Sequence, residues 1–168
     1  MVSEKKINLF CSNNKVDGFH GIDIKEGTNV DTVMDLNKYP WDIEDNSIEE
    51  IISLHYVQKV DDIIKFMQEI YRILKPGGSI KIIAPYYTSM IASQDPTHKR
   101  LISESTFIYF NKNWREVNKV EDYKCDFDFV YGYEFTPDWV NRSQEAKAFA
   151  VKHYNNVVNA IHITLTKR

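Results

Sequence analysis

The sequence predicts an α/β protein whose sheet is mostly parallel and ends in an antiparallel edge strand. Three observations support this prediction: four short apolar runs in the first third, one strongly amphipathic helical segment followed by another apolar run, and an alternating aromatic run near the C-terminus. A helix between two apolar strands indicates a right-handed crossover and parallel pairing. The predicted strands cover residues 6–11, 19–24, 30–36, 48–54, 79–85, 126–135 and 157–165.

The first two predicted strands are short apolar runs that end at turn-forming residues. Residues 6–11 end at Ser12-Asn13-Asn14, and residues 19–24 end at Lys25-Glu26-Gly27. Only seven residues, Ser12 to Gly18, separate these strands, which is too few for a usual crossover helix. We therefore expect a fold abbreviated at its first crossover helix. The missing helix would leave one sheet face less covered and favour self-association as a homo-oligomer.

The clearest helix is predicted over residues 61–74. Its apolar residues recur at positions i, i+3, i+4 and i+7 and form one stripe, and Pro76-Gly77-Gly78 follows as a stop signal. In residues 126–135 aromatic residues alternate with other residues, which predicts a strand with one buried face. A helix over 142–154 comes next, and the last two strands are expected to pair antiparallel.

Composition limits the class of protein. The length of 168 residues and the 43% hydrophobic content suit one compact domain, taken as residues 1–168. The net charge of −3 argues against nucleic acid as a partner. Cys11 and Cys125 lack metal-ligand spacing, so no metal site is expected. Because no segment is apolar enough for a signal peptide or a membrane span, we expect a cytoplasmic protein without membrane contact.

Two carboxylates come at the ends of successive predicted strands. Asp23 ends the second strand and Asp35 lies at the end of the third. In open α/β sheets ligands bind at the carboxyl ends of the strands, where an acidic residue after the second strand accepts both hydroxyls of a ribose. The second carboxylate would accept from an adenine amine. The alternative is that both are helix caps or turn formers.

The order of short motifs makes the chain resemble a known family. The segments Ile7-Asn8-Leu9-Phe10-Cys11-Ser12-Asn13 and Gly18-Phe19-His20-Gly21-Ile22-Asp23 are followed by Leu74-Lys75-Pro76-Gly77-Gly78 and by Asp95-Pro96-Thr97-His98. In this pattern the sequence resembles the class I S-adenosylmethionine-dependent methyltransferases, in particular a short, methyltransferase-type-11-like subfamily. The resemblance covers residues 6–112.

This resemblance implies a Rossmann-like sheet with a reversed seventh strand, S-adenosylmethionine as cofactor, and methyl transfer to a small-molecule or sugar-like acceptor. Asp23 would hold the ribose, and a histidine would serve as general base where the acceptor carries a proton. The other implied cofactor-binding residues are Cys11, Ser12 and Asn13 below the methionine, Asp35 and Leu36 at the adenine, and Ser53 and His55 at the methionine end. The candidate catalytic bases are His55 and His98; for each of them a structural role is the alternative, and His55 has the better position at a strand's carboxyl end.

Two departures from the family pattern leave other functions open. Phe10 and Ser12 stand where the family has glycines, which allow positive φ and close approach to a ligand. Gln58-Lys59 replaces a Glu-His pair. The alternatives are a catalytically impaired binding or interaction module, and a nucleotide-binding domain that uses Asp23 for a ribose. Aromatic residues that would suit an acceptor pocket are Tyr86, Tyr87, Tyr109 and Trp114.

Overall fold

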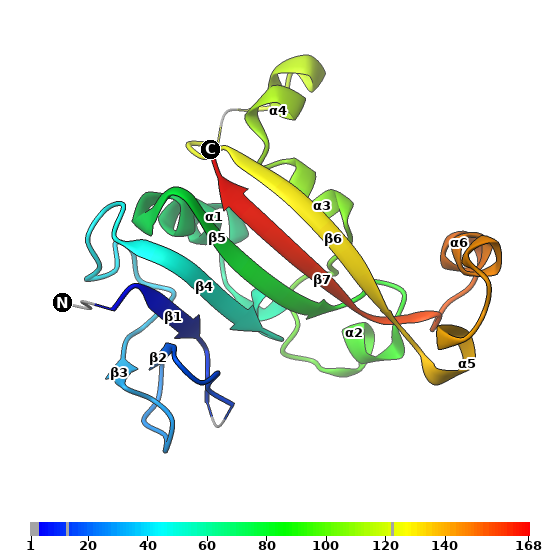
Figure 1. Cartoon of the computed structure of the whole chain (residues 1–168), viewed down its shortest axis with the longest axis horizontal. Coiled ribbons are helices and arrows are strands. Elements are labelled where there is room, and N and C mark those ends of the chain that lie inside the picture. The colour runs from blue at the N-terminus through cyan, green and yellow to red at the C-terminus, as the bar shows by residue number, and fades with distance from the viewer. Residues whose placement is uncertain (1–3, 13, 122) are drawn as a thin grey trace.

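Seven strands form one mixed sheet in the computed structural model, which describes residues 4–12, 14–121 and 123–168. The strand order is β3-β2-β1-β4-β5-β7-β6 (Figure 1). The strands are β1 (Lys6–Leu9), β2 (His20–Asp23), β3 (Thr32–Val33), β4 (Ile48–Leu54), β5 (Leu74–Pro85), β6 (Phe127–Phe135) and β7 (Val158–Lys167). The helices are η1 (Val57–Lys59), α1 (Ile63–Ile73), α2 (Met90–Gln94), α3 (Ser105–Ile108), α4 (Lys112–Asn118), α5 (Pro137–Val140) and α6 (Gln144–His153).

Strand directions agree with the predicted topology. Strands β1 to β5 pair in parallel, and β7 runs antiparallel to both β5 and β6. The described residues between β1 and β2 contain no helix, so the abbreviated first crossover is confirmed. The third strand is much shorter than the predicted 30–36. It stops because Asp35 forms a turn, accepting a hydrogen bond from the Asn37 amide at 3.1 Å.

Helix α1 and strand β5 form the central crossover. Asp62 caps α1 by accepting from the amides of Ile64 and Lys65, and the predicted apolar stripe faces the core. Strand β5 begins at Leu74, five residues earlier than predicted, because Leu74 already pairs with Ile48 of β4. Helix α1 therefore ends at Ile73, and the Pro-Gly-Gly segment lies within β5.

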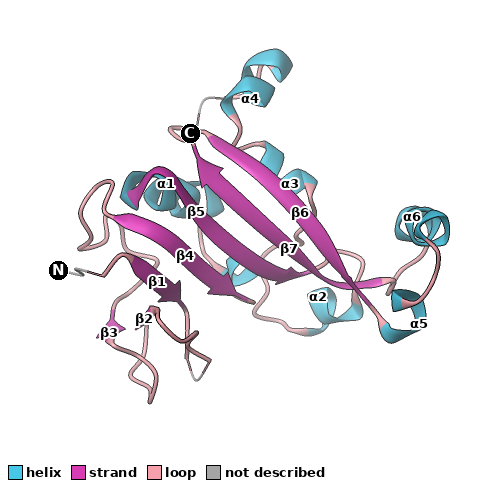
Figure 2. Ribbon diagram, in the orientation of Figure 1, coloured by secondary structure: helices cyan, strands magenta, loops and turns pink. Residues whose placement is uncertain are grey.

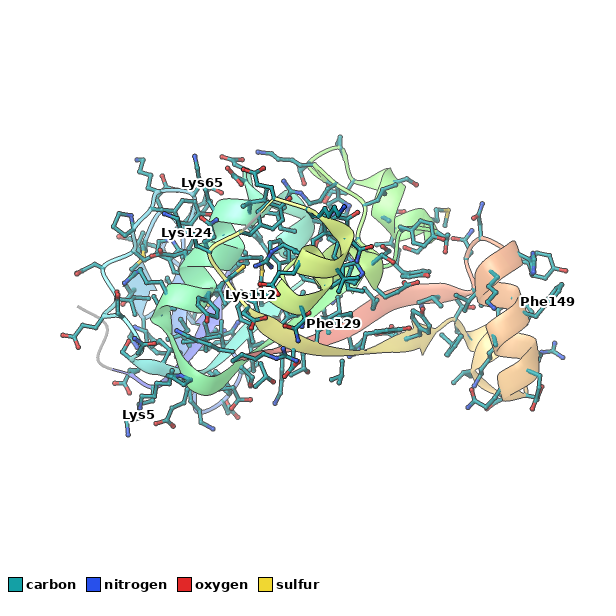
Figure 3. The ribbon with its side chains drawn as sticks, turned by 90° about the horizontal axis from the view of Figure 1, so that it is seen from above. Lys5, Lys65, Lys112, Lys124, Phe129 and Phe149 are labelled. Atoms are coloured by element: carbon teal, nitrogen blue, oxygen red, sulfur yellow. The ribbon has the colours of Figure 1, made fainter. Side chains whose placement is uncertain are left out.

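Within the described parts of the chain, helices cover only one face of the sheet (Figure 2). Figures 2 and 3 show α1, α3 and α4 on the same side of the strands, where apolar residues of every long strand are fully buried. On the opposite face Lys81, His162 and Val130 are exposed, and a hollow of about 410 Å³ lies over the strands. The missing crossover helices would normally cover this face.

Helices α5 and α6 lie at the far end of the long β6–β7 hairpin, away from the other helices (Figure 1). For this reason the predicted burial of the aromatic face of β6 holds only in part. Phe127 is fully buried, but Tyr131 is 49% exposed. None of the described helices is long and apolar enough to cross a membrane.

Candidate active site

The loop after β1 keeps a glycine-like backbone although it lacks the glycines. Phe10 has a φ of +54° and Ser12 has a φ of +45°, in the left-handed region that side chains disfavour. Three backbone hydrogen bonds hold the loop: the Phe10 amide donates to Ile22 O at 2.8 Å, the Asn14 amide to Cys11 O at 2.7 Å, and the Ser12 amide to Asp23 Oδ2 at 2.8 Å. The surrounding contacts thus impose the backbone geometry that glycine would adopt freely.

Asp23 links this loop to the end of β2. Its Oδ2 accepts from the Ser12 amide, and its Oδ1 accepts from the Ile24 amide at 2.7 Å. Because each carboxylate oxygen has a further acceptor position, the half-exposed Asp23 can still accept two hydroxyl hydrogens. Both amide donors also fix the direction of the carboxylate.

The end of β4 meets the same loop. His55 is exposed and also has a positive φ, of +55°, and its amide donates to Ile83 O at 2.7 Å. The next residue, Tyr56, stacks on Phe10 with ring centroids 3.2 Å apart and planes 12° apart. Burial, together with the negative charge of nearby Asp23, raises the pKa of the Tyr56 hydroxyl. Three residues with positive φ, Phe10, Ser12 and His55, therefore lie where the carboxyl ends of β1 and β4 are neighbours. Strained backbone of this kind is common at functional sites.

Gln58 and Lys59, the second departure from the family pattern, pair with the loop after α2. The Gln58 amide nitrogen donates to His55 O at 2.8 Å and to His98 Nε2 at 3.3 Å. Lys59 donates to Asp95 Oδ2 at 2.8 Å, and this contact, with hydrogen bonds from Thr97, holds the pKa of the Asp95 carboxyl well below its usual range. The two residues connect η1 to the 95–98 loop.

His98 lies inside this connection. Its Nδ1 donates to Ala92 O at 2.9 Å, which leaves Nε2 as the acceptor for Gln58. The His98 side chain is only 8% exposed. In this arrangement both ring nitrogens are engaged within the fold.

The remaining predicted site residues differ in their access to solvent. Ser12, Asp35 and His55 are exposed and Asp23 is half-exposed, whereas Cys11, Leu36 and Ser53 are buried. Asn13 lies outside the described residues. These exposed residues lie at the carboxyl ends of β1, β2 and β4 and just after β3. The strand order reverses between β1 and β4, and ligands bind at such a point in open α/β sheets.

Two features of this edge were missed in the sequence. One is the Phe10–Tyr56 stack, since nothing local indicates that Tyr56 would contact a residue 46 positions earlier. The other is Glu104, whose Oε2 accepts from the Tyr86 hydroxyl at 3.2 Å. Tyr86 itself is buried, and Tyr87 is 44% exposed and lines a cavity of about 410 Å³. Tyr109 and Trp114 contact each other, with centroids 4.6 Å apart.

A seven-stranded sheet of this order, with a reversed β7 and an acidic residue after β2, defines the class I methyltransferase fold. Comparison with known proteins agrees: residues 15–82 match the Methyltransferase domain family. A methyltransferase from Archaeoglobus fulgidus, described as S-adenosylmethionine-dependent, superposes with a TM-score of 0.67 and 17% identity, covering 98% of this chain and 86% of that chain. The predicted fold and the predicted resemblance are confirmed.

Two further matches are to nematode proteins. Phosphoethanolamine N-methyltransferase 2 of Caenorhabditis elegans is 30% identical over 97 residues, which are 58% of this chain and 21% of that protein. The chain thus matches about a fifth of the length of this curated relative. Phosphoethanolamine N-methyltransferase 2 of Haemonchus contortus, solved in complex with S-adenosyl-L-methionine, has a TM-score of 0.52 and 18% identity, covering 99% of this chain and 49% of that chain.

Proposed function

We propose that residues 1–168 form a single methyltransferase-like domain that binds S-adenosylmethionine and transfers its methyl group to a small-molecule acceptor. The observation that carries this proposal is the loop after β1, which holds left-handed φ values at both family glycine positions and directs its Ser12 amide at Asp23. The family match over residues 15–82 and the methyltransferase fold of the structural neighbours support it.

The residues present fit this cofactor. Asp23 has free acceptor positions for the two ribose hydroxyls, and Phe10 and Ser12 hold an αL backbone at the two positions where the resemblance implies glycine. The cofactor supplies an activated methyl on a sulfonium, so the protein has mainly to orient the acceptor and exclude water. The Phe10–Tyr56 stack, in which Phe10 is only 7% exposed, packs the loop after β1 against the residue that follows His55.

Of the two candidate bases, His55 is the better placed to take a proton from an acceptor. It is exposed at the end of β4, while both nitrogens of His98 are engaged within the fold. An imidazole suits this role because it titrates near neutral pH. We assign His98 a positioning role through Gln58.

The binding-module alternative rests on the two departures from the family pattern, one at Phe10 and Ser12 and the other at Gln58 and Lys59. Phe10 and Ser12 have left-handed φ values that glycine adopts without strain, and Gln58 and Lys59 have partners in the 95–98 loop. These departures are therefore accommodated by the fold, and they do not favour loss of activity. The nematode relatives named as phosphoethanolamine N-methyltransferases favour a small acceptor.

Calorimetric titration with S-adenosylmethionine and S-adenosylhomocysteine tests the proposal. We expect both to bind, and Asp23→Ala to weaken binding by about one to two orders of magnitude, the scale of lost hydrogen bonds to a charged group. Asp128→Asn, at an exposed carboxylate on β6, is the matched control and should bind as the native protein does. Absence of binding in the millimolar range would overturn the proposal. Adenosine nucleotides binding in its place would favour the nucleotide-binding alternative.

A further inference from the structure

A groove is lined mainly by strand β6 and helix α6. Helix α6 lies at the end of the β6–β7 hairpin (Figure 1). Its volume is about 380 Å³, within the range of small-molecule sites. One wall consists of three aromatic side chains on the same face of β6, Tyr131, Tyr133 and Phe135, with successive ring centroids 5.5 and 5.9 Å apart. Their planes are inclined by 58° and 75° to one another, so this wall presents both ring faces and ring edges.

The wall opposite the rings carries one apolar side chain larger than alanine, Val151. Residues Gln144, Lys147, Ala148 and Val151 recur along one flank of α6 and line the cavity. Large apolar side chains would normally fill the space between a helix and a strand. The largest apolar residue of α6, Phe149, instead points away from the protein and is 56% exposed (Figure 3).

Charge is unevenly distributed along the groove. Lys147 and Lys152 lie on the helix side, and within the described part of the chain neither forms an ion pair. The Lys147 ammonium lies 4.9 Å from the centroid of the Phe135 ring and donates to Val140 O at 2.7 Å. Glu104 also lines the cavity and already accepts from the Tyr86 hydroxyl. The groove thus combines two cationic groups, an aromatic wall and one acceptor.

We propose that this groove is a binding site for a flat aromatic molecule that carries an anionic group. The ring lies against Tyr131, Tyr133 and Phe135, where aromatic pairs gain energy beyond their buried area. The anion pairs with Lys147 and Lys152, and a hydroxyl or amine on the ring donates to Glu104. This site is separate from the loop after β1, so its test does not depend on the cofactor.

Calorimetry with 4-hydroxybenzoate on the full chain, without cofactor, provides the test. We expect binding to 4-hydroxybenzoate, and about tenfold weaker binding both to 4-hydroxybenzamide, which lacks the anion, and to 4-hydroxycyclohexanecarboxylate, which lacks the flat ring. Equal binding of all three probes would contradict the proposed recognition. No binding of 4-hydroxybenzoate in the millimolar range would overturn the site itself.

Variants locate the binding. Ala148→Phe places a ring in the groove from an exposed position and should abolish binding, while the double variant Lys147→Gln/Lys152→Gln should weaken it at least tenfold. Phe149→Ala, on the outward side of the same helix, is the matched control and should bind as the native protein does. Unchanged melting temperatures would verify folding. Unaltered binding in Ala148→Phe would place the ligand elsewhere and refute the proposal.

Discussion

The Phe10 ring lies flat on the Tyr56 ring, with centroids 3.2 Å apart, and joins the loop after β1 to the residue that follows His55. Phe10 is 7% exposed and belongs to the hydrophobic core. A side chain at a position where the family has glycine thus becomes part of the packing that holds the loop. At the proposed cofactor site, the same Phe10 residue therefore has a strained backbone and a side chain whose packing stabilises the fold.

Replacing Phe10 by glycine should destabilise the protein. Truncating a buried Phe costs about 3–5 kcal/mol, and glycine adds about 0.5–1 kcal/mol of backbone entropy. Relief of the left-handed φ returns only about 1–2 kcal/mol. We expect the free energy of unfolding to fall by about 3 kcal/mol in urea denaturation.

Ser12→Gly is the matched control for Phe10→Gly. Ser12 has a similar φ but an exposed side chain, so strain is relieved with little packing lost. A gain of about 0.5 kcal/mol is expected in the same denaturation experiment. Equal effects of the two substitutions would show that the stack contributes no stability.

Gly21→Ala should disturb the loop after β1, because Gly21 of β2 lies close to Cys11. A Cβ at Gly21 would overlap Asn29 O and come within 2.8 Å of Cys11 Sγ. Overpacking of this kind costs about 1–3 kcal/mol, which thermal unfolding would detect. Gly132→Ala is the control, because a Cβ there has no heavy atom within 4 Å among the described residues. If Gly21→Ala and Gly132→Ala have the same melting temperature, the close packing of Gly21 against Asn29 and Cys11 does not limit the side chain at this position.

Lys167 is a buried cation that connects the last strand to the end of α1. Its ammonium donates to Asn46 Oδ1 at 2.7 Å, Tyr71 O at 2.6 Å and Leu74 O at 2.7 Å. Lys167→Met leaves the two carbonyls without this donor, so we expect a loss of about 2–4 kcal/mol in the free energy of unfolding.

Burial lowers the pKa of Lys167 below its unfolded value. The unfolded chain therefore keeps this proton to higher pH than the folded chain, and stability rises with pH between the two pKa values. In the alkaline range up to the unfolded pKa of about 10.4, the native protein should gain stability relative to Lys167→Met. A pH-independent difference in urea unfolding would contradict this.

Asp95 should contribute to stability at neutral pH and lose this contribution in acid. Its folded pKa is depressed by hydrogen bonds from Lys59 and Thr97. The contribution is complete above the unfolded pKa of about 3.9 and disappears as the pH falls toward the folded pKa. Native protein should therefore exceed Asp95→Asn in stability at pH 7, with the difference narrowing below about pH 4. A constant difference across an acid titration would refute the assignment.

Local periodicity was sufficient for strand β4 and for helix α1. Strand β4 has the predicted bounds, and the stripe of α1 is buried as predicted, because both patterns repeat within a single element. Sequence patterns did not predict the bounds of strands that depend on contacts with other segments. Strand β3 pairs with β2 over only two residues before the turn at Asp35, and β5 starts early because Leu74 pairs with Ile48 of β4.

For the candidate site, the sequence by itself determined which residue types end the strands. Asp23 and His55 follow apolar runs, and strand polarity alone brings them to one edge. Only the tertiary structure decided how Phe10 and Ser12 would replace two glycines, because their φ values are set by Ile22, Asp23 and Tyr56, contacts of long sequence separation. Hydrophobic periodicity is a property of neighbouring residues, whereas backbone strain is stabilised only by the packing that surrounds it.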